Sequence, residues 1–430
     1  MKSKNIFRNP YLLFFPFLVL FIIWVLISPT DGVYGDQHRY LKFAQNLLHG
    51  FYSTPAPNIS LTNGPGYPIF LMPFLVLKLP LICITLANAF LYYFSIIFIF
   101  KALKEIVSSS VALTFSFAWA SYFIAYQNMP LIHTETFTYL LITILIFSII
   151  KVFKNDTPVI FTKYVILSGF IFGYIVLTKM IFGNVLLVVL TGSVVLWIFN
   201  RKIQNYRKGL VIIIIAFITT APYLVYTYHL TDKLFYWGNG DDSLYWMSTP
   251  HEGEYGDWTE ELVQNPIDFG NYNIRGADSV LIAHHFEEFK EINKYTGIEK
   301  DEVYKRIAIN NIKSHPIKYT QNIIYNIGRL IFHYPYSYAI QRPKSLLVFP
   351  INGIIFTLIL FSLIPTFINW RKFPFSIRFL LFIAVIYLGG SALVSASLRM
   401  FTIAVPILLV WIAYVIHNTL KINFRFNEKE

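Results

Sequence analysis

Ten stretches of this sequence are apolar over lengths close to the thickness of a lipid bilayer. A helix needs about 17 to 25 mostly apolar residues to cross the hydrocarbon core. The runs occupy about residues 11–29, 80–100, 107–127, 136–153, 164–178, 181–199, 210–230, 346–368, 379–395 and 401–416. The chain of 430 residues is also 56% hydrophobic and 13% charged, a composition that would leave a water-soluble domain with large exposed apolar patches. We therefore predict an all-α integral membrane protein with about ten transmembrane helices and additional juxtamembrane helices.

Lysine and arginine are unevenly distributed over the two sides that ten spans would define. The short segments on the side of the two termini hold 18 of them, and those on the other side hold five when the 231–345 loop is left out. Because basic residues accumulate in cytoplasmic loops, both termini are predicted to be cytoplasmic. The net charge of +12 is then explained by topology, and we expect no nucleic-acid partner.

The longest polar segment divides the chain into three parts. Residues 1–230 form a predicted transmembrane catalytic module whose first outer loop covers 30–79. Residues 231–345, with 12 basic and 16 acidic side chains, form a predicted extracytoplasmic loop domain. The remaining 346–430 supply the C-terminal transmembrane helices and a cytoplasmic tail.

The two halves of the long loop differ in pattern. Residues 231–280 are rich in Gly, Asp, Asn, Tyr and Trp and show no sustained helical period, which predicts an irregular cap. From about 279 to 329 the pattern becomes helical, and Pro316 is expected to begin a helix that returns to the membrane.

Acidic residues are scarce before the long loop. There are five of them through residue 230, namely Asp31, Asp36, Glu105, Glu135 and Asp156. Glu105 and Asp156 fall in basic connections predicted to be cytoplasmic, where they are expected to be solvated, and the other three fall outside.

Asp36 begins the segment DQHRYLKFA, which ends ahead of Gly50. On a helix, Asp36, Tyr40 and Ala44 share one face because they are four residues apart. This pattern predicts an interfacial helix that presents a carboxylate at the membrane surface. The alternative is an N-cap aspartate of an ordinary surface helix.

Glu135 lies in NMPLIHTETFTYLL, at the start of the fourth apolar run. A carboxylate at this position is costly unless it is paired, bound to a metal or hydrated in a cavity, so a functional role is the first hypothesis. An acid favoured by the helix dipole is the alternative. For His133, two residues earlier, a structural or hydrogen-bonding role is favoured over metal ligation.

Two lone cations lie on the same predicted side as these acids. Lys179 follows one apolar run and Arg399 precedes another. Both suit an anionic lipid headgroup or a diphosphate, although interfacial anchors would look the same. The segment NGPGYPIFLMPF, residues 63–74, predicts a rigid turn that enters the membrane again, with glycines that allow close backbone approach.

Several function classes are disfavoured by what the sequence lacks. It has no GxxxxGK[ST] nucleotide loop, no HExxH zinc motif and no GxSxG elbow, and its one cysteine, Cys83, excludes a cysteine cluster. Charged residues inside the apolar runs are nearly absent, which weakens a transporter interpretation.

Taken in order, these elements resemble the polytopic C-superfamily (GT-C fold) glycosyltransferases, in particular the bacterial family related to protein O-mannosyltransferases and the aminoarabinose transferases of lipid A. The family's D-x-x-x-Y-x-x-x-A-x-x-L-x-x-G pattern is matched by Asp36, Tyr40, Ala44, Leu47 and Gly50. Its later elements are matched by Pro65, Gly66, Tyr67 and Pro68, by Glu135, by Lys179 in place of the commoner arginine, by His315, Pro316 and Tyr319, and by Ser397, Arg399, Met400 and Pro406. Asn63 and Gly64 stand where the family often has an arginine.

The resemblance implies a transferase that moves a sugar from a polyprenyl-phosphate donor to a glycan, lipid or protein acceptor. Transfer would take place on the extracytoplasmic face of a membrane, and a bacterial cytoplasmic (inner) membrane is expected. A cell-surface polysaccharide polymerase or ligase and a lipid or sugar transporter remain as alternatives. Besides donor and acceptor, membrane lipids are the expected partners.

The chemistry of such a transfer assigns roles to the candidate residues. A carboxylate must take the proton of the acceptor hydroxyl, and Asp36 is the first choice for this base. Glu135 could orient the acceptor, bind a divalent metal together with Asp36, or act as the base itself. Lys179 and Arg399 would stabilise the charge that grows on the leaving phosphate. The predicted substrate-binding residues are Tyr40, Tyr67, His133, His315 and Tyr319.

Overall fold

The computed structural model describes residues 9–28, 32–33, 35–56, 59–154, 162–199, 204–233, 238, 240–257, 278–337, 343–394 and 396–419. All regular structure in these ranges is helical. The helices are α1 (Pro10–Leu13), α2 (Phe15–Ile27), α3 (Asp36–Leu48), α4 (Gly66–Val76), α5 (Leu81–Leu103), α6 (Ser109–Ala120), α7 (Phe123–Tyr126), α8 (Glu135–Lys154), α9 (Lys163–Thr178), α10 (Ile181–Phe199), α11 (Gln204–Thr231), α12 (Gly240–Met247), α14 (Asp278–Ile292), α15 (Gly297–Ser314), α16 (Pro316–Phe332), α17 (Pro343–Ile368), the 3-10 helix η2 (Trp370–Lys372), α18 (Phe375–Leu393) and α19 (Leu398–Thr419).

Each of the ten predicted apolar runs contains a helix, and the chain is an all-α, multi-pass membrane protein. Within the described ranges, seven helices are long and apolar enough to cross a membrane, namely α5, α8, α10, α11, α17, α18 and α19. Four further apolar helices, α2, α4, α6 and α9, are shorter. The first run is interrupted at Phe14, and the third is divided between α6 and α7.

The long loop is more helical than the sequence of its first half predicted. The predicted irregular cap contains the helix α12, because two acids at its start favour the helix dipole and Leu244, Tyr245 and Trp246 pack into a small apolar cluster. Residues 258–277 of that half, and Asp31 and Asp156, lie outside the described residues. The helical second half is confirmed by α14, α15 and α16, and Pro316 begins α16 as predicted.

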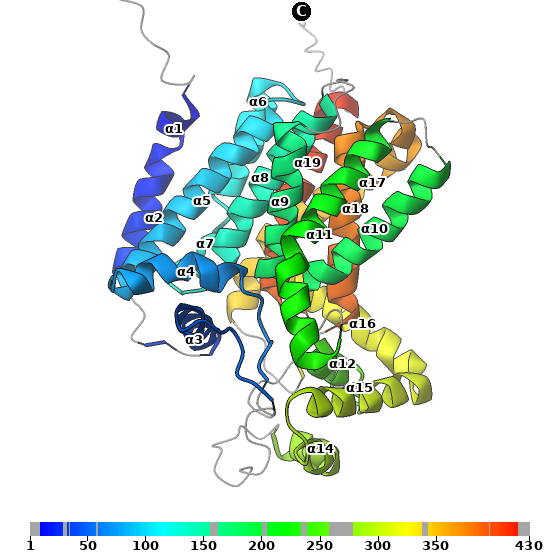
Figure 1. Cartoon of the computed structure of the whole chain (residues 1–430). Helices are drawn as coiled ribbons and strands as arrows, with labels where there is room; N and C mark the ends of the chain where they lie inside the picture. Colours follow the sequence, from blue (N-terminus) through cyan, green and yellow to red (C-terminus); the bar gives the residue numbers. More distant parts are fainter. Residues whose placement is uncertain are drawn as a thin grey trace, which may run out of the picture.

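The spans lie side by side, and smaller helices collect at one end of the bundle (Figure 1). At that end, which we call the α3 end, lie α3, α12, α14, α15 and α16, while α4 lies across the bundle and packs on α3. Helix α1 and the last turns of α19 lie at the opposite end. Because the two ends of the described chain lie at the same end of the bundle, an even number of crossings fits this arrangement.

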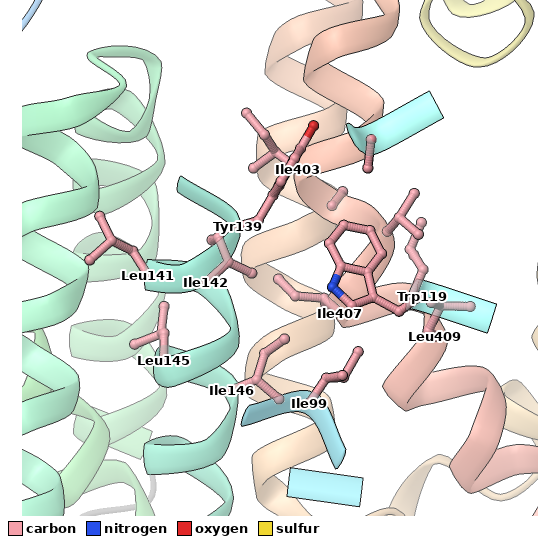
Figure 2. Packing of buried hydrophobic residues seen from close by; sticks show 14 of the residues in the cluster. Ile99, Trp119, Tyr139, Leu141, Ile142, Leu145, Ile146, Ile403, Ile407 and Leu409 are labelled. Atoms are coloured by element: carbon pink, nitrogen blue, oxygen red, sulfur yellow. The ribbon is translucent and has the colours of Figure 1, made fainter. Parts of the chain in front are cut away.

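Helices α8 and α19 form the centre of the bundle and are the most buried of the spans. Figure 2 shows apolar side chains between them and the neighbouring α5 and α6. The labelled residues are Ile99, Trp119, Tyr139, Leu141, Ile142, Leu145, Ile146, Ile403, Ile407 and Leu409. The Tyr139 hydroxyl lies 2.7 Å from Thr402 Oγ1. One turn earlier on each helix stand Glu135 and Arg399, so this packing brings the two charged residues together.

Candidate functional site

Four predicted residues from four distant segments meet at the α3 end of the bundle. Arg399 donates to Asp36, with 3.0 Å between Nη1 and Oδ2, although the two residues are 363 positions apart. The same Arg399 nitrogen lies 4.0 Å from Glu135 Oε1. Lys179 Nζ donates to Glu135 Oε1 at 2.8 Å. We call Asp36, Glu135, Lys179 and Arg399 the site cluster.

The members of the site cluster stand at helix termini. Asp36 and Glu135 are the first residues of α3 and α8, where the positive end of the helix dipole favours a carboxylate. Lys179 directly follows the last residue of α9, where the dipole favours a cation. Arg399 is the second residue of α19. Glu135 is the most buried, with 5% of its side chain exposed, against 40% for Arg399.

The glycines around the start of α4, Gly64 and Gly66, are needed to place Lys179. A Cβ atom on Gly64 would lie 2.1 Å from the carbonyl oxygen of Leu177, and one on Gly66 would lie 2.5 Å from Thr178 Oγ1. The Tyr174 hydroxyl donates to the Gly66 carbonyl at 2.9 Å. The predicted close backbone approach is therefore present, and it packs the glycine segment against the residues that immediately precede Lys179.

Tyr40 and Tyr67 pack edge to face, with 5.2 Å between ring centroids. Tyr67 is fully buried, and its hydroxyl has no hydrogen-bond partner among the described residues. Asn63 Nδ2 lies 3.4 Å from the Tyr40 hydroxyl. Burial raises the pKa of the Tyr40 hydroxyl, and the nearby Asp36 carboxylate raises it further, so Tyr40 keeps its proton and can donate it in a hydrogen bond.

His133 lies next to Glu135, with 3.9 Å between His133 Nδ1 and Glu135 Oε2. Burial lowers the pKa of the His133 imidazole despite the neighbouring Glu135, so the ring is neutral at neutral pH. His315 and Tyr319 lie at the start of α16, and neither lines the cavities described next. The Tyr319 hydroxyl donates to the carbonyl of Leu393 at 2.8 Å. Substrate binding by these two residues stays a prediction.

The Asp36–Arg399 pair stands between two cavities. The first cavity, of about 330 Å³, is also lined by Lys179, Arg39 and Tyr40. The second cavity, of about 440 Å³, is lined on the other side by His133, Gln127, Asn128, Tyr139 and His333. Asp36, Ser397 and Arg399 line both. A group bound in either cavity would thus reach the same carboxylate and the same guanidinium.

Some residues of the first cavity were not predicted as site residues. Arg39 pairs with Asp36 from the next turn of α3 and adds a third cation to the cavity. Its three-residue spacing from Asp36 was a usable signal. Asn63 also had one, because it stands where the resembling family often has an arginine. Asp257 and Tyr387 line the cavity as well, and no sequence pattern marked them.

Asp36 is held in its ionised form. Burial alone would raise the pKa of the Asp36 carboxyl, but Arg399 and then Arg39 outweigh burial and hold that pKa below its usual value. The carboxylate is therefore charged at neutral pH and can accept a hydrogen bond. The same pairing makes it a weak base while Arg399 stays bound to it.

The position of Arg399 also decides how well Asp36 and Glu135 fit a metal ion. Its guanidinium lies within 3.0 Å of one carboxylate and 4.0 Å of the other, in the space that a bridging cation would need. No group of three or more His, Cys, Asp or Glu side chains in the described ranges is placed to hold a metal. In this arrangement a guanidinium takes the place beside the two acids, and metal binding by Asp36 and Glu135 stays a prediction.

Comparison with known proteins gives similarity of fold without similarity of sequence. No family model matches the chain, and no curated protein matches it. The crystal structure of the Archaeoglobus fulgidus oligosaccharyltransferase, tethered to an acceptor peptide with the NVT sequon, superposes with a TM-score of 0.51 at 12% identity. The alignment covers 94% of this chain and 49% of that one, so this chain spans about half of its length.

Two further structures are similar to a lesser degree. AglB from Archaeoglobus fulgidus, in complex with an inhibitory peptide and a dolichol-phosphate, gives a TM-score of 0.49 at 12% identity, covering 93% of this chain and 50% of that one. ArnT from Cupriavidus metallidurans, bound to undecaprenyl phosphate, gives 0.40 at 11% identity, covering 94% and 77%. The oligosaccharyltransferase of the first comparison has the GT-C fold, so the fold implied by the sequence resemblance is confirmed.

Proposed function

We propose that this chain is a membrane glycosyltransferase that moves a sugar from a polyprenyl-phosphate donor to an acceptor hydroxyl. The observation that carries the proposal is the site cluster: an ionised carboxylate, Asp36, is paired with Arg399 between two cavities, and Lys179 lines the first of these cavities. The GT-C fold supports it, because the sequence resemblance that predicted this fold also implies a lipid-linked donor.

In the proposed reaction, Asp36 takes the proton of the acceptor hydroxyl as its oxygen attacks the anomeric carbon of the sugar. The bond between that carbon and the phosphate oxygen breaks, and polyprenyl phosphate leaves with the bonding electrons. Lys179 and Arg399 stabilise the negative charge that grows on the leaving phosphate. Glu135 holds Lys179 in place and, through it, the phosphate side of the site.

Donor binding would also activate the base. Arg399 holds the pKa of Asp36 below its usual value in the free protein. A donor phosphate in the first cavity gives Arg399 a second anion to pair with. As the guanidinium moves toward the phosphate, its ion pair with Asp36 weakens. The pKa of the carboxyl then rises toward its ordinary value, and Asp36 becomes a stronger base when the donor is present.

An apolar cavity next to the first cavity suits the isoprenoid part of the donor. This third cavity, of about 850 Å³, is lined mainly by apolar side chains, from α10, α11, α16, α17, α18 and α19. Neighbouring residues of α18 face different cavities, since Tyr387 lines the first and Leu388 the third. The same holds for Met400 and Phe401 of α19. A lipid tail and its phosphate could thus lie on either side of these two helix segments.

The second cavity would then receive the acceptor. Its imidazole, amide and hydroxyl groups, from His133, Gln127, Asn128 and Tyr139, can donate to and accept from hydroxyl groups. We place this end of the bundle on the extracytoplasmic side, because the charge count assigns the opposite end to the cytoplasm. We further propose that residues 231–345, whose described helices α12, α14, α15 and α16 lie at the same end, select among glycan, lipid and protein acceptors.

The test is a reconstitution with defined substrates. Purified protein in detergent is incubated with labelled undecaprenyl-phosphate monosaccharides and with glycan, lipid and peptide acceptors, and products are separated by mass. Addition of one sugar, with release of undecaprenyl phosphate, is the expected result. Growth of a polymer would indicate a polymerase instead. Movement of the intact donor across a liposome membrane without chemistry would indicate a transporter.

A further inference from the structure

Helix α16 carries a buried polar stripe that the proposed chemistry does not use. Lys318, Asn322, Asn326 and Arg329 are four, four and three residues apart, so they share one face of the helix. All four are buried, with exposed fractions of 9%, 0%, 0% and 0%. Buried polar groups need hydrogen-bond partners, and here the partners are mainly backbone carbonyls of other segments.

The first two residues of the stripe hold the loop after α12. Lys318 Nζ donates to the Glu254 carbonyl at 2.7 Å. Asn322 Nδ2 donates to the carbonyls of Met247 and Thr249, both at 3.1 Å. This loop leads to Asp257, which lines the first cavity.

Asn326 holds the turn between α18 and α19. Its Nδ2 lies 3.2 Å from the Ser391 carbonyl oxygen and 3.0 Å from that of Ala392, and it also donates to Val394. These belong to the end of α18, where carbonyls have no partner within their own helix. The Asn326 Oδ1 accepts from the backbone N–H of Ala396 at 3.0 Å, three residues before Arg399. One carboxamide thus joins the end of one helix to the start of the next.

Arg329 fixes the orientation of that carboxamide. Its Nη2 donates to Asn326 Oδ1 at 3.0 Å, so this oxygen receives two donors and the amide nitrogen must face the carbonyls of the turn. Its Nη1 donates to the Pro335 carbonyl at 3.3 Å. Tyr336, the next residue, lines the first cavity. The stripe therefore connects two walls of that cavity.

From these contacts we propose that Asn326, oriented by Arg329, is a positioning residue for Arg399. The carboxamide holds residues 391–394 and Ala396 in the positions from which the Arg399 guanidinium reaches both Asp36 and Glu135. Without it, the end of α18 loses its caps, and the guanidinium no longer has a defined place. An effect on transfer rests on the proposed function, but the effect on the turn does not.

A distance measurement tests the turn without reference to activity. Spin labels are placed on Leu393→Cys, the exposed last residue of α18, and on Gln45→Cys, exposed on α3, in a Cys83→Ser background. Asn326→Asp has nearly the same shape but cannot donate to the carbonyls, and Asn326→Ala removes the group. Gln321→Ala, on the exposed face of the same helix, is the matched control. Two Asn326 variants are used so that a failure of one to fold does not end the test.

The expected result is one narrow distance distribution in the parent and in Gln321→Ala, and a broadened one in either Asn326 variant. A narrow distribution in the folded Asn326 variants would overturn the proposal. This readout stands even if no glycosyl transfer is found, so failure of the proposed function and failure of the positioning role are distinguishable.

A double-mutant cycle then tests whether Asn326 acts through Arg399. Asn326→Asp should lower the transfer rate about tenfold to hundredfold, as expected when a reacting group is misplaced by about 1 Å. In an Arg399→Ala background the same change should have no further effect, because there is no guanidinium left to position. Equal losses in both backgrounds would show a general structural effect and would contradict the positioning role.

Discussion

Two clusters of buried charged side chains lie at the α3 end, and they differ in how completely their hydrogen bonds are satisfied. The outer cluster, in the loop domain, is centred on Glu254 and His285. Glu254 Oε2 lies 2.8 Å from His285 Nε2, and Glu254 Oε1 lies 2.8 Å from His284 Nδ1. His285 Nδ1 lies 3.1 Å from Glu288 Oε2 and 2.8 Å from the Tyr245 hydroxyl. None of these residues lines the first or the second cavity.

The site cluster and the residues around it have unsatisfied hydrogen bonds. Within the cluster Glu135 Oε2, and beside it His133 Nδ1 and the Tyr387 hydroxyl, are buried and have no hydrogen-bond partner among the described residues. Buried polar atoms without partners are costly, unless a bound ligand supplies the missing hydrogen bonds. The comparison teaches that buried charge alone does not identify a functional site. Unused hydrogen-bonding capacity beside a cavity distinguishes the site cluster from the outer cluster, which serves the packing of the loop domain.

The largest expected effect on stability comes from breaking the site cluster at its most buried member. Glu135→Ala leaves Lys179 without its carboxylate, and breaking a buried ion pair in this way costs about 3 to 5 kcal/mol. Thermal unfolding in detergent measures the loss. Glu105→Ala is the matched control, because Glu105 pairs with Lys151 and Lys154 at the other end of α8 but is 22% exposed. Its expected cost is below about 1 kcal/mol. Equal losses would show that the two ends of α8 do not differ.

The outer cluster should make stability depend on pH. Burial alone would lower the pKa of His285, but Glu254 and Glu288 outweigh it and raise that pKa from 6.5 to about 9. Because the pKa is higher in the folded state, this stabilisation is complete below about pH 6.5 and is lost as the pH rises through about 9. It amounts to at most about 3 kcal/mol. His285→Gln should flatten the fall of the unfolding temperature over this interval, and an unchanged pH dependence would contradict the assignment.

A smaller effect is expected from a cation of the site cluster. Lys179→Ala should weaken donor use by about tenfold to hundredfold, the equivalent of one charged hydrogen bond of about 1.5 to 3 kcal/mol. Transfer rates measured against the concentration of undecaprenyl-phosphate sugar give this value. Lys163→Ala, at the first residue of α9, is the control and should leave donor dependence unchanged. If both variants behave like the parent, Lys179 is only an interfacial anchor.

Much of the fold could be predicted because lipid imposes a simple rule. Every apolar run of spanning length contains a helix, and Asp36 begins α3 as its amphipathic pattern indicated. The site cluster could be predicted from the sequence for a related reason. Charged residues are rare in the apolar part of the chain, so the few at helix ends on one side of the membrane had to collect in a small area.

The remainder depends on packing that local patterns do not encode. That Arg399 lies within reach of both carboxylates follows from the register of α19 against α8. The stripe on α16 donates to backbone carbonyls, which every residue type has. Its partners therefore leave no sequence motif that could have predicted it. His315 and Tyr319 were predicted from the resemblance alone. They line neither cavity at the site, because Lys318, Asn322, Asn326 and Arg329 form the buried face of α16 instead.

The central claim, that the carboxylate between the two cavities is the base, is tested most directly by Asp36→Asn. The variant keeps the shape of the side chain and removes its charge, and Glu287→Gln, an exposed acid of the loop domain, controls for loss of charge in general. With folding verified by thermal unfolding, single-turnover transfer from a labelled undecaprenyl-phosphate sugar should fall about 10² to 10⁴-fold in Asp36→Asn and remain unchanged in Glu287→Gln. Undiminished transfer by folded Asp36→Asn would contradict the account and remove Asp36 from the mechanism.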